Sequence, residues 1–121
     1  MMIRKITAAL IAAAALISSA HAQVVEGLDG RWEGALDAGG MTLHVVMRVA
    51  TANGATTAVL DSPDQDTIGI PATLTRTGAT AALDVPSILG SFKGALGPDG
   101  KTLTGAWSQG GVELPLTLTR K

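Results

Sequence analysis

The sequence predicts an all-β protein built as a single small up-and-down antiparallel barrel of about eight strands. From Gly30 onward, apolar and polar residues alternate with a period of two, which is typical of strands with one buried face. The alternating runs are short and are separated by Gly, Pro, Asn and Asp, the residues that favour turns. The chain after the first 22 residues is also rich in Gly, Thr, Ala, Val and Leu, a composition that favours strands over disorder.

The first 22 residues predict a secretory signal peptide. Met1 to Lys5 give a short cationic start, and Ala20-His21-Ala22 gives a small-x-small cleavage site. The apolar run between them, residues 6–17, is shorter than the ~20 residues that a membrane-spanning helix needs. We therefore expect cleavage after Ala22, a mature chain of 99 residues without a membrane span, and a periplasmic or secreted location.

The mature chain has room for one small domain, residues 23–121. Arg4 and Lys5 leave with the leader, so 7 Lys and Arg face 10 Asp and Glu, which gives a net charge of −3. This acidic balance argues against nucleic acid as a partner. The sequence has no cysteine, which excludes disulfides, thiolate metal sites, a cysteine nucleophile and a lipidated cysteine.

Four strands are expected in the first half of the mature chain. The longest of them places Met41 and four further apolar residues on the inward face, with His44 opposite. Asn53-Gly54 predicts a hairpin turn, because both residues tolerate positive φ. A polar loop begins at Ser62-Pro63. The expected strands cover residues 30–36, 41–50, 56–61 and 70–76.

Four more strands are expected in the second half. Thr77-Gly78 turns the chain into the fifth strand, which Pro86 ends. Pro98-Asp99-Gly100 and Gly110-Gly111 predict the remaining turns. These strands cover residues 80–85, 91–96, 102–108 and 113–119, and no helix is expected anywhere in the mature chain.

Eight such strands form either a barrel or a two-sheet sandwich, and three glycines favour the barrel. Gly34, Gly94 and Gly105 fall at inward positions in the middle of strands, where glycine marks a kink or a close approach of two backbones. Residues 30–36 and 90–96 also share the pattern Gly-x-aromatic-charge-Gly-Ala-Leu. We interpret this repeat as structural.

The side chains that usually perform catalysis are nearly missing from the mature chain. It has no Tyr, no Cys and one histidine, His44, on a predicted polar face without a Gly-x-Ser-x-Gly nucleophile motif. We expect a protein that is not an enzyme and uses no cofactor. A small hydrolase that works through carboxylates ranks last among the hypotheses.

The densest polar cluster is Asp61-Ser62-Pro63-Asp64-Gln65-Asp66. Three carboxylates in six residues suit a cation such as calcium, but the spacing matches no known calcium loop. Pro63 and the Asp and Ser side chains also suit an ordered turn, so we expect a turn and no metal. Whether the cluster also serves in binding is open at this point.

The three aromatic residues, Trp32, Phe92 and Trp107, are all predicted on inward faces. They either fill the barrel or line a cavity for an apolar ligand, since eight-stranded barrels hold one small molecule when side chains leave room. The size of such barrels favours the filled interior.

Several motifs together resemble a known kind of domain. They are Gly30-x-Trp32-x-Gly34, then Asp61-Ser62-Pro63-Asp64-Gln65 with Gly69-Ile70-Pro71, and Gly105-x-Trp107-x-Gln109-x-Gly111 with Leu114-Pro115-Leu116-x-Leu118. With them the mature chain resembles the small β-domain that precedes the catalytic domain in secreted bacterial serine hydrolases of the α/β-hydrolase type. A weaker likeness, carried by the Gly-x-Trp start, is to lipocalin-like barrels. The catalytic residues of those hydrolases lie in the following domain, so the resemblance implies an accessory module whose hydrolase is absent.

Our first hypothesis is a non-catalytic barrel that binds a small apolar or extended ligand, or an envelope protein. The second is an interaction subunit that modulates a separately encoded secreted serine hydrolase. The oligomeric state is not predicted. The candidate binding residues are Trp32, Trp107, Asp61, Ser62, Asp64 and Gln65.

Overall fold

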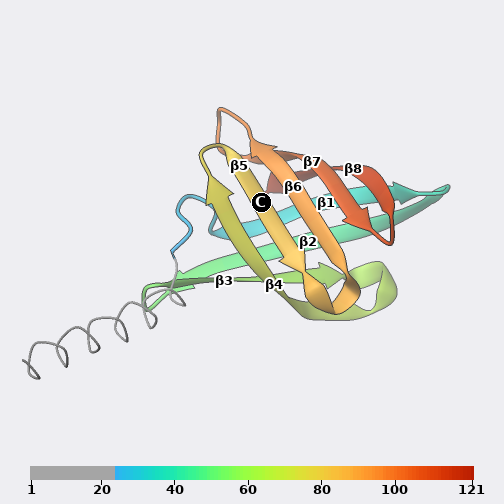
Figure 1. The fold of residues 1–121 in the computed structure, drawn as a ribbon, viewed down its shortest axis with the longest axis horizontal. Coiled ribbons are helices and arrows are strands. Elements are labelled where there is room, and N and C mark those ends of the chain that lie inside the picture. Colours follow the sequence, from blue (N-terminus) through green and yellow to red (C-terminus); the bar gives the residue numbers. More distant parts are fainter. Residues whose placement is uncertain (1–23) are drawn as a thin grey trace, which may run out of the picture.

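A computed structural model describes residues 24–121, which form one closed barrel of eight antiparallel strands (Figure 1). Each strand pairs with its neighbours in the sequence, so the predicted up-and-down barrel is confirmed and the sandwich alternative is wrong. Two short 3-10 turns, η1 (Pro63–Gln65) and η2 (Pro86–Ile88), replace simple loops. The predicted signal peptide lies outside the described residues. The strands are β1 (Gly30–Ala38), β2 (Met41–Ala52), β3 (Ala55–Ser62), β4 (Thr67–Thr77), β5 (Thr80–Val85), β6 (Gly90–Leu96), β7 (Thr102–Gln109) and β8 (Val112–Arg120).

The barrel closes between its first and last strands. Trp32 pairs with Arg120, and Glu33 pairs with Thr119. The N–H of Lys121 extends the seam by donating to the carbonyl oxygen of Arg31 at 2.8 Å. Closure removes the free edges that an open sheet exposes.

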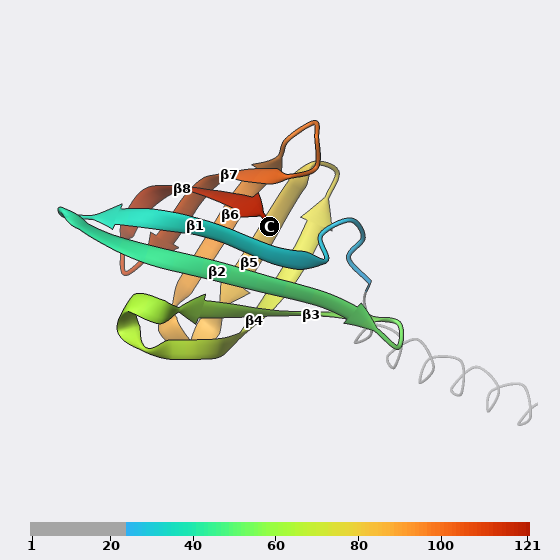
Figure 2. The ribbon, with the colours of Figure 1, turned by 180° about the vertical axis from the view of Figure 1, so that it is seen from behind.

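The inward residues of all eight strands form one apolar core, as the alternation predicts. Met41 is the exception, since it was predicted inward but is 62% exposed. It is the first residue of β2, and Figure 2 shows that the β1–β2 hairpin extends beyond the rest of the barrel. The alternation of apolar and polar residues continues to Met41, but the hairpin there lies beyond the barrel interior, so the Met41 side chain is exposed.

The glycines predicted at close backbone approaches do lie there. Gly94 and Gly105 are direct cross-strand partners on β6 and β7. A Cβ atom at Gly105 would lie 1.8 Å from the carbonyl oxygen of Lys93 and 2.6 Å from the Cα of Gly94. A Cβ at Gly34 would lie 2.3 Å from the carbonyl oxygen of Thr117. Only glycine allows the strands to coil this tightly.

One end of the barrel is sealed by the segment that precedes β1. Leu28 is fully buried there, and its carbonyl oxygen accepts a hydrogen bond of 2.9 Å from the indole Nε1 of Trp32. The Arg120 guanidinium lies 4.5 Å from the centre of the Trp32 ring, an attractive cation–π geometry, and also donates to the carbonyl oxygen of Gly27. We call this the closed end.

Replacing Gly105 with alanine should destabilise the barrel by about 3 kcal/mol or more, because the added methyl group meets backbone atoms, which cannot turn aside as a side chain can. Urea denaturation of Gly105→Ala and of the parent protein measures the difference. Thr104→Ala, an exposed change on the same strand, serves as the control and should cost less than about 1 kcal/mol. Equal stabilities of Gly105→Ala and the parent would contradict the packing described.

Candidate functional site

A cavity lies at the opposite end of the barrel. At this end β1, β3, β5 and β7 finish and the even-numbered strands begin. We call it the open end. The cavity has a volume of about 290 Å³, roughly that of ten water molecules at ~30 Å³ each. Most of its wall is apolar, and the polar groups belong to five residues. The apolar residues are Leu36, Leu43, Val45, Leu60, Ile70, Ile88 and Trp107, and the polar ones are Asp61, Ser62, Gln65, Thr67 and Gln109.

Trp107 is held in the cavity wall by its neighbours. A Cβ at Gly90 would lie 2.4 Å from the Trp107 ring, so glycine at that position makes room for the indole. The Trp107 Nε1 donates to the Gln109 side-chain oxygen at 3.1 Å, and the Gln109 Nε2 donates to the carbonyl oxygen of Ile88 at 2.9 Å. Gln109 thus connects the indole to η2 and fixes one side of the mouth.

The polar cluster at residues 61–66 contains the 3-10 turn η1, and the chain adopts the same backbone conformation again at η2. Pro63 begins η1 and Pro86 begins η2, and the N–H groups of Asp66 and Leu89 donate to the carbonyl oxygens of these two prolines at 3.1 Å. Asp66 and Leu89 both adopt the left-handed conformation with a φ of 53°. Since η2 forms without any acidic residue, the cluster's backbone shape needs no bound cation.

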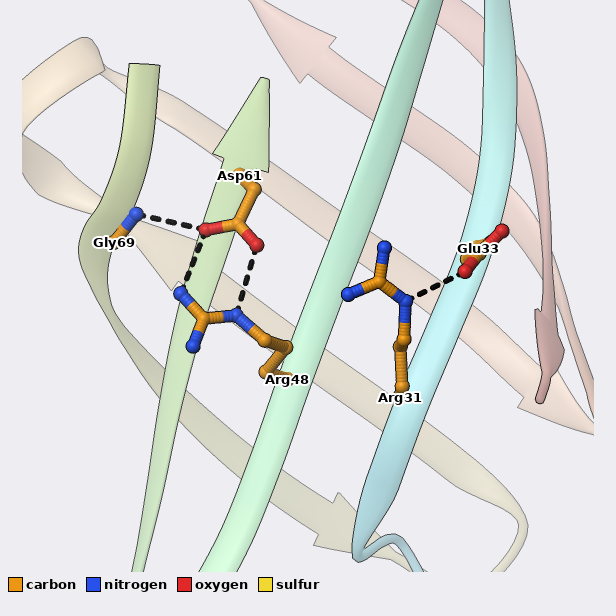
Figure 3. Close-up of polar contacts among 5 residues, drawn as sticks. All are labelled: Arg31, Glu33, Arg48, Asp61 and Gly69. Atoms are coloured by element: carbon orange, nitrogen blue, oxygen red, sulfur yellow. Dashed lines mark hydrogen bonds and ion pairs between the residues drawn. The ribbon is translucent and has the colours of Figure 1, made fainter. Parts of the chain in front are cut away.

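Asp61 stabilises an irregularity between β3 and β4. The register shifts between Leu60 and Ser62, which leaves Gly69 with a φ of 77° outside the regular ladder. The Asp61 carboxylate accepts the Gly69 N–H at 2.7 Å and both Nε and Nη2 of Arg48 at 2.8 and 2.9 Å (Figure 3). Arg48 and the Gly69 N–H hold the pKa of Asp61 below its usual range, against the opposing effect of burial.

Asp64 lies on the outer wall and not in the cavity. Its carboxylate accepts the backbone N–H of His44 at 2.6 Å and contacts the His44 Nδ1 at 2.8 Å, which fastens η1 to β2. These contacts lower the pKa of Asp64. The neighbouring Ser62 hydroxyl donates to the Gln65 side-chain oxygen at 2.7 Å.

Four of the six candidate binding residues thus meet in one cavity: Trp107, Asp61, Ser62 and Gln65. The other two do not line it. Trp32 is fully buried at the closed end, and Asp64 binds His44 outside. The polar lining residues that the sequence reasoning missed are Thr67 and, with the clearer signal in the sequence, Gln109. Its signal is the Trp-x-Gln spacing, which puts both side chains on one face of a strand.

A larger hollow of about 650 Å³ lies on the outer wall of the barrel, over β4 to β7. Short side chains such as Thr73, Ala82, Ser91 and Ala106 border it. The cavity at the open end differs because its wall is the apolar interior of the barrel, which is the usual character of a small-molecule site.

Comparisons with known proteins add no family to this description: no protein family, no curated protein and no solved structure matches the chain. The fold of the described residues is therefore established as a small closed eight-stranded barrel, without a family assignment. Within residues 24–121, no helix has the length and apolar character needed to cross a membrane. Over the same residues, no group of three or more His, Cys, Asp or Glu is placed to hold a metal ion.

Asp61→Ala should lower the free energy of unfolding at pH 7 by about 2 kcal/mol or more, because it leaves the Gly69 N–H and the Arg48 guanidinium without their acceptor. Urea denaturation measures the loss. The Arg31–Glu33 pair in Figure 3 supplies the control, since both of its side chains are well exposed. Glu33→Ala should cost less than about 1 kcal/mol, and an equal loss in the two variants would refute the role given to Asp61.

The stability that Asp61 contributes should also depend on pH. A carboxyl whose pKa is lower in the folded state contributes fully above its unfolded value of about 3.9, and the contribution disappears as the pH falls through the folded value. The difference in unfolding free energy between the parent and Asp61→Ala should therefore be constant near pH 7 and shrink below about pH 4. A difference that does not change down to pH 2 would contradict the lowered pKa.

Proposed function

We propose that this domain is a non-catalytic module that binds a small apolar ligand in the cavity at the open end. The observation that supports the proposal is the cavity itself, in which aliphatic side chains and the Trp107 indole face a space of about 290 Å³. Apolar walls with a few placed polar groups are typical of sites for small molecules. The Gln65 amide at the mouth, whose oxygen accepts the Ser62 hydroxyl, is a polar group whose nitrogen can orient a ligand.

The chemistry of the cavity supports binding over catalysis. Ser62 donates its hydroxyl to Gln65, and the single histidine of the described residues lies on the outer wall against Asp64. Asp61 is held as a carboxylate by Arg48. No nucleophile among the lining residues therefore has a general base beside it. The leader sequence supports a periplasmic or secreted location for this binding.

A second candidate is that the module docks on a separately encoded secreted serine hydrolase. The resemblance to the hydrolase-associated β-domain rests most on one motif, residues 61–65 with 69–71. This motif forms the η1 side of the open end. Its exposed residues are accessible to a protein: Pro63, Asp64, Gln65, Gly69 and Pro71. Repeated affinity capture from the native envelope that recovers no hydrolase would argue against this candidate.

Titration with 1-octanol and 1-decanol tests the proposed cavity through tryptophan fluorescence. Trp107 lines the cavity and Trp32 does not, so the two residues give separate signals. The parent protein and Trp32→Phe should show a saturable shift of emission to shorter wavelength, because the alcohol displaces water near the indole. Trp107→Phe should show no shift.

Leu43→Phe provides a second test in which the indole is kept. Leu43 is half-buried at the cavity wall, so a larger side chain fills part of the space. Affinity for 1-decanol should fall by about tenfold, the effect of losing roughly 1.4 kcal/mol of apolar contact. If none of these proteins responds to either alcohol, or if Trp32 responds as Trp107 does, the proposed function is wrong.

A further inference from the structure

The charges of the barrel are separated along its axis. Every Lys and Arg of the described residues lies at the closed end or in the middle of a strand: Arg31, Arg48, Arg76, Lys93, Lys101, Arg120 and Lys121. Six of the ten acids lie within two residues of a connection at the open end: Asp37, Asp61, Asp64, Asp66, Asp84 and Glu113. The open end therefore carries an excess of negative charge, and Arg48 is the one Lys or Arg of the described residues that pairs with an acid there.

Only one of these six acids is neutralised by a strong base. Asp61 pairs with Arg48, and Asp64 contacts His44. Among the described residues, Asp37, Asp66, Asp84 and Glu113 form no ion pair with Lys or Arg. Of the six acids, Asp61 lines the cavity, whereas Asp84 and Glu113 border the hollow on the outer wall. Together the acids give this end of the barrel a negative potential, which attracts cations and repels anions.

Exposed apolar side chains are concentrated at the same end. Each of the four connections there carries one on or beside it: Met41, Ile68, Leu89 and Val112, which are 62, 65, 83 and 55% exposed. At the closed end, the exposed large apolar side chain among the described residues is Val24, which is 51% exposed in the segment before β1. Apolar groups around a cavity mouth extend the surface that an apolar ligand can cover.

Leu89 is the most informative of the four. It has a φ of 53°, a conformation in which a leucine is strained, and almost its whole side chain faces solvent. At the equivalent position of η1 the chain has Asp66, a residue type that tolerates this conformation better. Leucine at position 89 therefore serves neither the backbone nor the core, so its role lies on the surface of the open end.

We propose that the open end selects a small cationic amphiphile, whose apolar chain enters the cavity beside Trp107 and whose positive head group lies in the negative potential of the open end. The inference rests on the proposed function, since it names the class of ligand for that cavity. Charge complementarity favours this class over the two other simple classes of amphiphile. An anionic amphiphile such as a fatty acid meets repulsion at the mouth, and a neutral one gains nothing from the acids.

Three probes with the same chain test this selectivity: decyltrimethylammonium, 1-decanol and decanoate, each below its critical micelle concentration. With Trp107 emission as the signal, the cation should bind at least about tenfold more tightly than decanoate at low salt. The ratio should shrink between 0.01 and 1 M ionic strength, because the Debye length falls from about 30 to 3 Å. The affinity of 1-decanol should change little.

Matched charge variants identify the groups responsible. Asp37→Asn with Asp66→Asn removes two exposed charges at the open end, and Glu26→Gln with Asp99→Asn removes two elsewhere. The first pair should lower the affinity for decyltrimethylammonium roughly threefold and leave that for 1-decanol unchanged. The second pair should change neither. Circular dichroism confirms that each variant keeps its strands.

Leu89→Asn tests the apolar part of the mouth. The affinity for all three probes should fall, while the thermal midpoint should rise, because asparagine relieves the strain at a φ of 53°. A purely structural role for Leu89 predicts the opposite change in stability and no change in binding.

The outcomes separate the two levels of the proposal. If 1-decanol binds but the cation binds no more tightly than decanoate, the selectivity is wrong and the apolar cavity stands. The same conclusion follows if the open-end charge variants bind the cation as the parent does. If none of the three probes binds, the cavity proposal itself is wrong and the selectivity with it.

Discussion

The narrow interior of an eight-stranded barrel is the constraint on which the rest of this structure depends. Such a barrel is just wide enough for its own side chains to fill it, so the position of each large residue decides where space remains. Trp32 and Leu28 fill the closed end, and Arg120 covers the indole from outside. Gly94 and Gly105 bring β6 and β7 together with no side chain between them. Space is left at the open end, where Trp107 and the aliphatic residues form a wall and not a filled layer.

The polar interactions of the open end serve to keep this wall in place. Asp61 holds the β3–β4 irregularity through Arg48 and Gly69, and Gln109 holds Trp107 and η2 together. Asp61 and Gln109 find these hydrogen-bond partners within the protein, so the cavity wall is held in shape without a ligand. A preformed site of this kind avoids the cost of ordering side chains on binding.

Strand periodicity and turn residues were sufficient to predict the fold. All eight strands, the barrel and the three close glycine approaches followed from which residues alternate and where glycine interrupts them. The alternation assigns a side chain to a face of the strand but not to a height along the barrel axis. Trp32 and Trp107 therefore looked equivalent in the sequence, although one seals an end and the other lines the cavity.

The contacts of the site depend on geometry that local patterns do not contain. The bond from Gly69 to Asp61 requires the register shift at residues 60–62, and the second 3-10 turn requires leucine in a conformation that its propensity disfavours. The axial separation of charge, by contrast, was accessible from the sequence. Once the strands alternate in direction, residues near every second connection share one end of the barrel, and six acids do so here.

A crystal structure of the protein under xenon pressure tests the central claim most directly, because xenon enters apolar space that water and side chains leave empty. We expect xenon beside Trp107 and Leu60 at the open end and none beside Trp32. A cavity filled by its own side chains, with no xenon at Trp107, would contradict it and turn attention from ligands to protein partners.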